Sequence, residues 1–218
     1  MAKHKNNPPV SSSQLIELIG KEGLIAGVDE VGRGALFGPV MAAVVVLRVK
    51  DLPQLVEIGV KDSKLLSAKK RSGSIAPIQN IVSSWSVGWA TVAEIDRLNI
   101  LQASLLAMKR AVIKLKVTPD LCLVDGDRPI PDLTVPQQNL IGGDRISVAI
   151  SAASIIAKVW RDDLIVRLAR SYPNYDLPAN KGYGTKKHLL ALQQYGPSKM
   201  HRISFRSCRV PQKGGHSV

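Results

Sequence analysis

Acidic residues follow apolar, strand-like runs at separate places in this 218-residue chain. Asp29 and Glu30 end the first run, and Asp125 ends a later one. Asp144 follows a pair of glycines. An ionised carboxylate at a buried strand end is costly unless a cation or several hydrogen-bond donors meet it. Since Mg²⁺ and Mn²⁺ prefer oxygen ligands, the pattern predicts that these acids form a divalent-metal site.

Clustered carboxylates of this kind could hold two ions, the arrangement used in metal-assisted phosphodiester cleavage. In that chemistry the ions activate a water on one side of the phosphate and stabilise the leaving oxygen on the other. Without metal the acids repel one another, so at least one pKa is expected to rise. Adjacent strand residues face opposite ways, so Asp29 and Glu30 share the site only if the strand twists or bends at Glu30, which Gly32 permits.

A glycine-flanked arginine, Gly32-Arg33-Gly34, follows the first acidic pair and predicts a sharp turn. Glycines also let a ligand approach main-chain groups that a Cβ would cover, and a phosphate or a sugar fits such a loop. The competing interpretation is an ordinary solvated turn, because a Gly-x-Gly pattern alone is a weak signal. Its position at the end of a strand favours the functional interpretation.

Two other basic stretches keep two interpretations open. Residues 61–64, ahead of a helix capped by Ser67, fit a phosphate-contact loop and equally a helix start on a solvated face. His188 and His201 lie in a basic C-terminal segment, where phosphate contact and structural hydrogen bonding are equally plausible.

The composition restricts the class of protein. Thirty Lys and Arg against seventeen Asp and Glu give a net charge of +13, which favours a polyanionic partner over a generically basic protein. No apolar run reaches the roughly 20 residues of a membrane span, and the N-terminus lacks the apolar segment of a secretory signal. Cys122 and Cys208 indicate reduced thiols and a cytoplasmic setting rather than a disulfide framework.

Hydrophobic periodicity predicts an α/β fold, and the length of the chain fits one domain. We expect a flexible tail over 1–12, a catalytic core over 13–170, a helical C-terminal portion over 171–207 and a basic tail over 208–218. The elements predicted within the core are a helix over 13–21, a strand over 24–30 forming a hairpin with 39–47, a strand over 83–92, a helical face over 93–116, strands over 120–125 and 138–141, and a helix over 147–170.

Taken together and in order, these motifs make the chain resemble bacterial type 2 ribonuclease H, ribonuclease HII, from Leu24 to Phe205. The residues that carry the resemblance are Gly27-Val28-Asp29-Glu30-Val31-Gly32-Arg33-Gly34, Asp62-Ser63-Lys64, Ile95-Asp96 with Asn99-Ile100, Val124-Asp125-Gly126, Gly143-Asp144, Ala152 to Val159, Lys181-Gly182-Tyr183-Gly184-Thr185 with His188, and His201-Arg202 with Ser204-Phe205. Each motif is weak alone, and the ordered set is highly specific.

The resemblance implies a ribonuclease H-like mixed five-stranded sheet flanked by helices, with a helical C-terminal portion. It implies an enzyme that cleaves the RNA strand of RNA–DNA hybrids, and DNA duplexes 5′ of single embedded ribonucleotides, with Mg²⁺ or Mn²⁺, leaving 3′-hydroxyl and 5′-phosphate ends. We also expect the protein to be a monomer. The residues implied as catalytic and metal-binding are Asp29, Glu30, Asp125 and Asp144. Those implied as substrate-binding are Gly32, Arg33 and Gly34 at the 2′-hydroxyl, Tyr183 against the sugar at the junction, and Lys64 and Thr185 at phosphates.

Some features depart from the family pattern or leave alternatives. Ala35 stands where the family commonly has proline and should loosen the turn, so junction selectivity is less secure than catalysis. Leu65 replaces a frequent second lysine after Asp62-Ser63-Lys64. Asp127 adds a carboxylate of unassigned role. A type 3 ribonuclease H is the rival enzyme, but the roughly twenty residues before Leu24 are too few for its extra N-terminal domain. A catalytically idle duplex binder is the other rival, and it would have no reason to keep four acids at strand ends.

Overall fold

The computed structural model describes residues 12–60 and 66–209. Its centre is one five-stranded sheet in the order β3-β2-β1-β4-β5. The strands are β1 (Leu24–Val31), β2 (Val40–Arg48), β3 (Ser84–Ala90), β4 (Leu121–Asp125) and β5 (Gln137–Leu140). β2 runs antiparallel to both β1 and β3, whereas β4 runs parallel to both β1 and β5. The predicted mixed sheet is therefore confirmed, including the β1–β2 hairpin.

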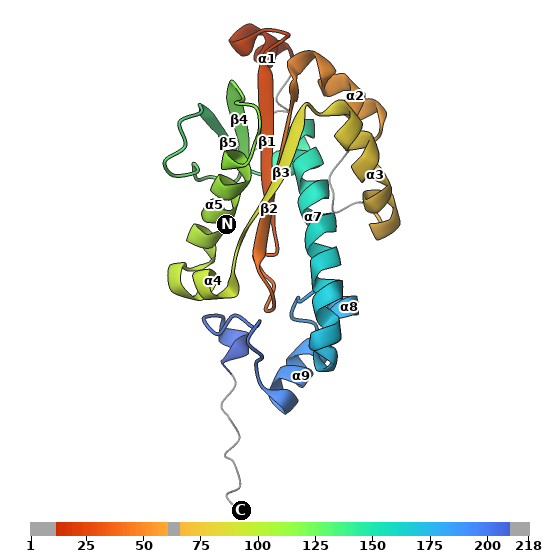
Figure 1. The fold of residues 1–218 in the computed structure, drawn as a ribbon, viewed down its shortest axis with the longest axis vertical. Coiled ribbons are helices and arrows are strands. Elements are labelled where there is room, and N and C mark those ends of the chain that lie inside the picture. The colour runs from red at the N-terminus through yellow and green to blue at the C-terminus, as the bar shows by residue number, and fades with distance from the viewer. Residues whose placement is uncertain (1–11, 61–65, 210–218) are drawn as a thin grey trace, which may run out of the picture.

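Helices cover both faces of this sheet (Figure 1). α7 lies with α2 and α3 on one face, and α4 and α5 lie on the other. α8 and α9 lie at the far end of the molecule from α1 (Figure 1). The helices are α1 (Ser12–Ile19), α2 (Leu52–Glu57), α3 (Ala68–Ile81), α4 (Val92–Leu98), α5 (Ile100–Ile113), α6 (Gly143–Ile146), α7 (Val148–Leu168), α8 (Leu177–Asn180) and α9 (Lys186–Tyr195).

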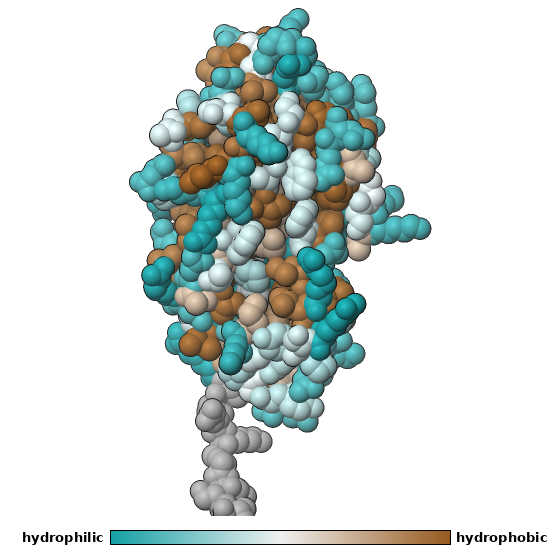
Figure 2. Space-filling view, in the orientation of Figure 1, coloured by the Kyte–Doolittle hydropathy of each residue, from teal (hydrophilic) through white to brown (hydrophobic). Residues whose placement is uncertain are grey.

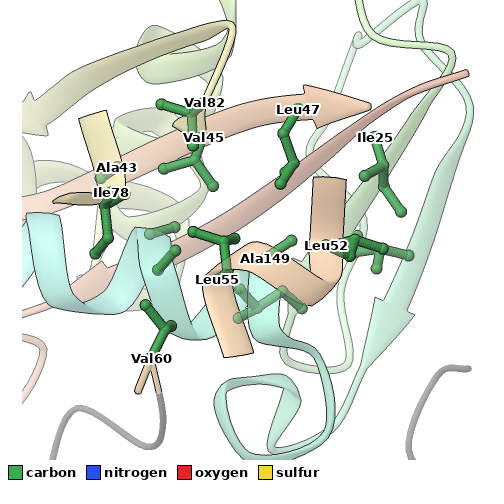
Figure 3. Close-up of a cluster of buried hydrophobic side chains, with 14 of the residues drawn as sticks. Ile25, Ala43, Val45, Leu47, Leu52, Leu55, Val60, Ile78, Val82 and Ala149 are labelled. Carbon is green, nitrogen blue, oxygen red and sulfur yellow. The ribbon is translucent and has the colours of Figure 1, made fainter. Parts of the chain in front are cut away.

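The central strand β2 is apolar on both faces because both faces are covered. Ala43, Val45 and Leu47 pack toward α2, α3 and α7, and the residues between them pack toward α5. Figure 3 shows the first of these clusters, with Leu52 and Leu55 of α2 close to the strand residues. A strand buried on both sides needs a continuous apolar run rather than alternation, as this sequence has.

The start of α7 lies directly against β1. A Cβ on Gly27 would come within 2.3 Å of the Ala149 carbonyl oxygen, so only glycine allows this approach. The small residues predicted at the start of this helix are therefore required by close packing. Ser147 caps the helix by accepting a hydrogen bond from the Ile150 amide at 3.5 Å.

Most of the predicted elements are found within one to three residues of their expected ends. The continuous helical face expected over 93–116 was wrong, because Asn99 takes φ +72° and separates α4 from α5. The Asn99 side chain caps the second helix by accepting from the Gln102 amide at 3.1 Å. The sequence reasoning also missed α2 and α6. Ser67 caps α3 as predicted, accepting from the Lys70 amide at 3.3 Å.

The C-terminal portion is attached to the core by apolar and polar contacts. Phe37 and Ile165 of the core share a buried cluster with Tyr175 and Leu177. In addition, the carboxylate of Asp96 in α4 accepts hydrogen bonds from the amides of Ile203 and Ser204, at 3.2 and 3.0 Å, and from the Ser204 hydroxyl at 2.5 Å. These contacts hold the last helical segments against the end of the sheet. The domain boundary near residue 170 stays a prediction.

The surface is mixed in character. On the face drawn in Figure 2, hydrophilic side chains make up most of the outline and hydrophobic ones form smaller patches between them. Within the described residues we find no helix with the length and apolar character needed to cross a bilayer.

Candidate active site

The register of the sheet brings the acidic strand ends together. β1 and β4 are parallel, and Val28 pairs with Val124, so Asp29 and Asp125 occupy equivalent positions just beyond that pair. Ligand oxygens of Asp29, Glu30 and Asp125 all lie within 4.8 Å of one another. An all-oxygen carboxylate set of this size fits a hard divalent cation such as Mg²⁺ or Mn²⁺.

The adjacent acids Asp29 and Glu30 meet without a break in the strand. The antiparallel pairing of β1 with β2 continues without a bulge to Val31, which pairs with Met41. The β1–β2 pairing therefore has no β-bulge at Glu30, where the sequence led us to expect a twist or bend. The Asp29 carboxylate accepts a hydrogen bond from the Glu30 amide at 2.7 Å, which holds it close to its neighbour.

The electrostatics of these acids match a site built for cations. Burial raises the pKa of Asp29 well above its usual value, and the charges of Glu30 and Asp125 raise it further. The pKa of Glu30 is also raised, mainly by burial, although Arg33 opposes the shift. A bound cation would reverse these costs, because it favours the ionised form of each acid.

Asp144 lies close to this cluster but outside the group of three described above. It is buried, with 4% of its surface exposed, and its charge contributes to the raised pKa of Asp29. The preceding residue, Gly143, donates its amide hydrogen to the Asp125 carboxylate at 2.6 Å. Asp144 therefore sits one residue beyond a direct contact with the cluster, and its role as a metal ligand stays a prediction. Asp127 points elsewhere: its side chain is 69% exposed and lies 3.8 Å from Arg128.

The two glycines of Gly32-Arg33-Gly34 have different surroundings. Gly32 has φ +89°, and a Cβ there would come within 2.1 Å of Arg161 Nε. A Cβ on Gly34 would meet nothing within 4 Å. Gly32 is therefore required by the fold, whereas the empty space at Gly34 is open to a ligand. Arg33 forms an ion pair with Glu30 at 3.2 Å, while half of its side-chain surface stays exposed.

Tyr183 lies next to the glycine loop. Its main chain forms an isolated β-bridge with Ala35, and its ring lies 5.4 Å from both Lys158 Nζ and the Arg161 guanidinium carbon. The amide of Ala35 donates to the Gly32 carbonyl at 3.3 Å, a bond that the proline common at this position cannot make.

Two of the predicted phosphate contacts have different outcomes. Thr185 is the N-cap of α9, where its hydroxyl oxygen accepts from the His188 amide at 3.3 Å. Thr185 is exposed, and its contact with phosphate stays a prediction. Lys64 lies outside the described residues, with the rest of the 61–65 segment.

Asp29, Glu30 and Asp125, together with the glycine loop and Tyr183, line one cleft of about 410 Å³. Three polar residues that the sequence reasoning gave no role also line it, namely Arg71, Ser154 and Lys158. The Ser154 hydroxyl forms a hydrogen bond with the Asp29 carboxylate, and Lys158 forms an ion pair with Asp162 at 2.9 Å. The four-residue spacing of Ser154 and Lys158 places both on one helix face, and this spacing is the sequence feature that could have predicted them together.

Behind the glycine loop lie two arginines that are fully buried, Arg161 and Arg202. Arg161 donates to the carbonyls of Phe37, Pro39 and Lys181, at 3.0, 3.2 and 2.9 Å. Arg202 donates to the carbonyls of Gly38 and Arg33, at 3.0 and 2.9 Å. Together they tie the loop after β1 to the segment that carries Tyr183.

His188 and His201 are also buried, at 0% and 1% exposure. They form a hydrogen bond with each other, with the two Nε2 atoms 3.0 Å apart. Of the two interpretations left open by the sequence, the structure supports hydrogen bonding within the protein rather than direct phosphate contact.

Comparisons with known proteins agree with this geometry. The family model described as "Ribonuclease HII" matches residues 26–208. Ribonuclease HII of Trichormus variabilis is 59% identical over 188 residues, 86% of this chain and 84% of that protein. The crystal structure of the ribonuclease H2 from Pyrococcus horikoshii OT3 matches with a TM-score of 0.73 and 28% identity, over 85% of this chain and 95% of that one.

A structure of Bst-RNase HIII in complex with Mn²⁺ also matches, with a TM-score of 0.72 over 95% of this chain and 74% of that one. Its identity is 20%, so it supports the fold alone. The match of residues 26–208 to the ribonuclease HII model therefore favours type 2 over the rival type 3 interpretation. The chain belongs to the ribonuclease HII family, and it is a metal-dependent endoribonuclease that acts on RNA–DNA hybrids.

Proposed function

We propose that this enzyme cuts the RNA strand of hybrids and also cuts duplex DNA 5′ of a single embedded ribonucleotide, using Mg²⁺ or Mn²⁺. The observation that carries the proposal is one cleft that joins a carboxylate cluster to a glycine loop and an aromatic ring. A cleft with only the acids would explain hydrolysis. The loop and the ring add a means of recognising which sugar lies beside the acids.

Asp29, Glu30 and Asp125 would hold the metal, with Asp144 completing the set from α6. When bound, divalent ions supply activation of the attacking water and stabilisation of the leaving oxygen. The Ser154 hydroxyl orients Asp29, and the Gly143 amide orients Asp125 at 2.6 Å. Each of these two carboxylates is thus held by a donor from the protein, and a carboxylate has enough oxygen lone pairs to bind a cation as well.

The glycine loop and Tyr183 would read the sugar. The 2′-hydroxyl is the group that distinguishes RNA from DNA at a given position. Gly34 has open space where a Cβ would stand, so a sugar can approach the main chain of the loop. The Tyr183 ring would lie against the next sugar and disfavour a second hydroxyl there. Lys158, near that ring, and Arg71, Lys64 and Thr185 would contact phosphates.

A cleavage assay on three duplexes tests the proposal: an RNA–DNA hybrid, a DNA duplex with one ribonucleotide, and an all-DNA duplex. We expect metal-dependent cleavage of the first two, with the second cut 5′ of the ribonucleotide, and none of the third. Cleavage of the hybrid alone would overturn the junction assignment. Cleavage in the presence of a chelator would overturn the metal assignment.

We also propose that the enzyme works as a monomer in the cytoplasm. Both cysteines are buried free thiols, which fits a reducing compartment. Size-exclusion chromatography with light-scattering detection tests the oligomeric state. We expect the mass of one chain, 23.6 kDa, and a dimer mass would contradict the proposal.

A further inference from the structure

The buried imidazoles of His188 and His201 form a chain of hydrogen bonds that ends on the main chain of Tyr183. His188 Nδ1 lies 2.9 Å from the Tyr183 carbonyl oxygen. The two Nε2 atoms lie 3.0 Å apart, and His201 Nδ1 lies 2.9 Å from the Ser198 amide nitrogen and 2.8 Å from its hydroxyl. Groups of four residues between 183 and 201 are thus joined in one line.

The two ends of this line fix the position of the ring proton on each imidazole. The Ser198 amide can only donate, so His201 Nδ1 accepts and a neutral His201 carries its proton on Nε2. That proton is donated to His188 Nε2, which leaves the His188 proton on Nδ1. The Tyr183 carbonyl can only accept, and it receives that last proton. Both ends therefore require the same pair of tautomers.

The surroundings keep both rings neutral. Burial lowers the pKa of His188, and burial together with the neighbouring His188 lowers the pKa of His201 to about 4. The rings of Phe37 and Tyr175 pack against His201, with centroids 5.1 and 4.6 Å away. At neutral pH the pair is therefore an uncharged and directional connection.

The same segment also contacts the glycine loop. His201 forms an isolated β-bridge with Phe37, and the next residue, Arg202, donates to the Arg33 carbonyl at 2.9 Å. One short segment therefore holds Tyr183 through the imidazoles and Arg33 through the guanidinium. The relative placement of the two sugar-reading elements depends on it.

We propose that His188 and His201 are positioning residues that set Tyr183 against the Gly32-Arg33-Gly34 loop, and through it the preference for a single embedded ribonucleotide over a continuous hybrid. This inference rests on the proposed role of Tyr183. Neither imidazole touches the metal site or the substrate cleft, so the effect acts through the Tyr183 main chain.

Two substitutions at His188 separate the two hydrogen bonds of its ring. In His188→Asn the amide nitrogen takes the place of Nδ1, so the bond to Tyr183 is kept and the bond to His201 is lost. In His188→Gln the amide takes the place of Nε2, so the bond to His201 is kept and the bond to Tyr183 is lost. Both variants remove a buried ring, and each is therefore the control for the packing defect of the other.

The readout is the ratio of kcat/KM on a one-ribonucleotide duplex to kcat/KM on an RNA–DNA hybrid. We expect His188→Gln to lower this ratio about tenfold, because the Tyr183 carbonyl loses the imidazole donor and keeps the Thr185 amide at 2.8 Å, while His188→Asn lowers it much less. Equal ratios in the two variants would overturn the inference, because a general packing defect affects both alike. Tyr183→Ala is measured in parallel: if it leaves the ratio unchanged, the proposed role of Tyr183 fails, and not only the role of the histidines.

A measurement on the unmodified enzyme keeps the inference testable if both variants unfold. Long-range ¹H–¹⁵N correlation spectra report which ring nitrogen of each histidine carries the proton. We expect the proton on Nδ1 of His188 and on Nε2 of His201 at neutral pH. The opposite tautomer at either ring would contradict the connection to Tyr183.

Discussion

The two sides of the cleft are stabilised in opposite ways. On the acidic side, Asp29, Glu30 and Asp125 crowd together, and burial raises the pKa of the first two, so the protein alone leaves their charges poorly compensated. On the other side, Arg161 and Arg202 are buried cations whose charge is met by main-chain carbonyls. The acidic side therefore gains most from a bound cation. The other side, which carries Gly32-Arg33-Gly34 and Tyr183 and is called the sugar-reading side below, is already held by hydrogen bonds within the protein.

This difference assigns separate tasks to the two sides. A cluster that gains stability only with a cation is suited to holding metal for chemistry. A loop held at several carbonyls by buried guanidinium groups is suited to selecting a sugar by shape, because it does not adapt to the wrong one. Substitutions on the two sides should therefore have different effects on activity and on stability.

The largest effect is expected at the acidic side. Asp125→Asn should lower cleavage of either substrate by about a thousandfold or more, because it removes a charge that holds the metal. Without metal the same change should stabilise the fold by about 1 kcal/mol, since it removes repulsion with Asp29. Asp127→Asn, two residues along and exposed, is the matched control and should change neither quantity. A fully active Asp125→Asn enzyme would remove this residue from the site.

On the sugar-reading side the largest effect should be on stability. Arg161→Met removes the donor of three main-chain carbonyls, two of them in buried hydrogen bonds, so the free energy of unfolding should fall by at least about 3 kcal/mol in urea titrations. Arg202→Met should cost less, because it removes two such bonds and Arg202 Nη2 finds no acceptor within the described part of the chain. Arg128→Met at the surface is the control. A larger loss for Arg202→Met would contradict the proposed ranking.

The two glycines of the loop should respond differently to the same substitution. Gly32→Ala should destabilise the fold by about 2 kcal/mol or more, because the added methyl meets Arg161 at a positive φ. Gly34→Ala should change stability by less than about 0.5 kcal/mol, yet should weaken cleavage at a single ribonucleotide. Unfolding curves and the duplex assay measure the two effects. Equal destabilisation by both substitutions would show that Gly34 also serves the fold.

Acid should weaken the sugar-reading side through His201. Its pKa is lowered from 6.5 to about 4 in the folded state, so the unfolded chain binds the proton first as the pH falls. The contribution to stability is complete above pH 6.5 and is lost as the pH falls toward 4, by about 2 kcal/mol between pH 7.5 and 5. His201→Asn should remove this part of the pH dependence, and an unchanged slope would contradict it.

The sheet and the acids could be predicted from the sequence because both are local signals. Apolar runs give the strands, and Asp29 and Asp125 interrupt those runs where they end. The break at Asn99 was missed because the apolar spacing continues across it, while the capping side chain sets the actual boundary. The meeting of Asp29 with Asp125 follows once β1 and β4 are known to be parallel neighbours.

The support of the sugar-reading side could not be predicted in this way. Arg161 donates to a carbonyl 122 residues away, and Arg202 to one 169 residues away. Main-chain carbonyls have no sequence signature, so a buried arginine that binds them resembles a surface arginine in the sequence. The same holds for His188, whose partners are a carbonyl and a second imidazole.

A calorimetric titration with Mn²⁺ tests most directly whether the acids form a metal site. It compares the unmodified enzyme with Asp125→Asn and with the Asp127→Asn control, in the absence of nucleic acid. We expect saturable Mn²⁺ binding that is kept in Asp127→Asn and strongly weakened in Asp125→Asn. Equal binding by all three proteins, or none by the unmodified enzyme, would contradict it.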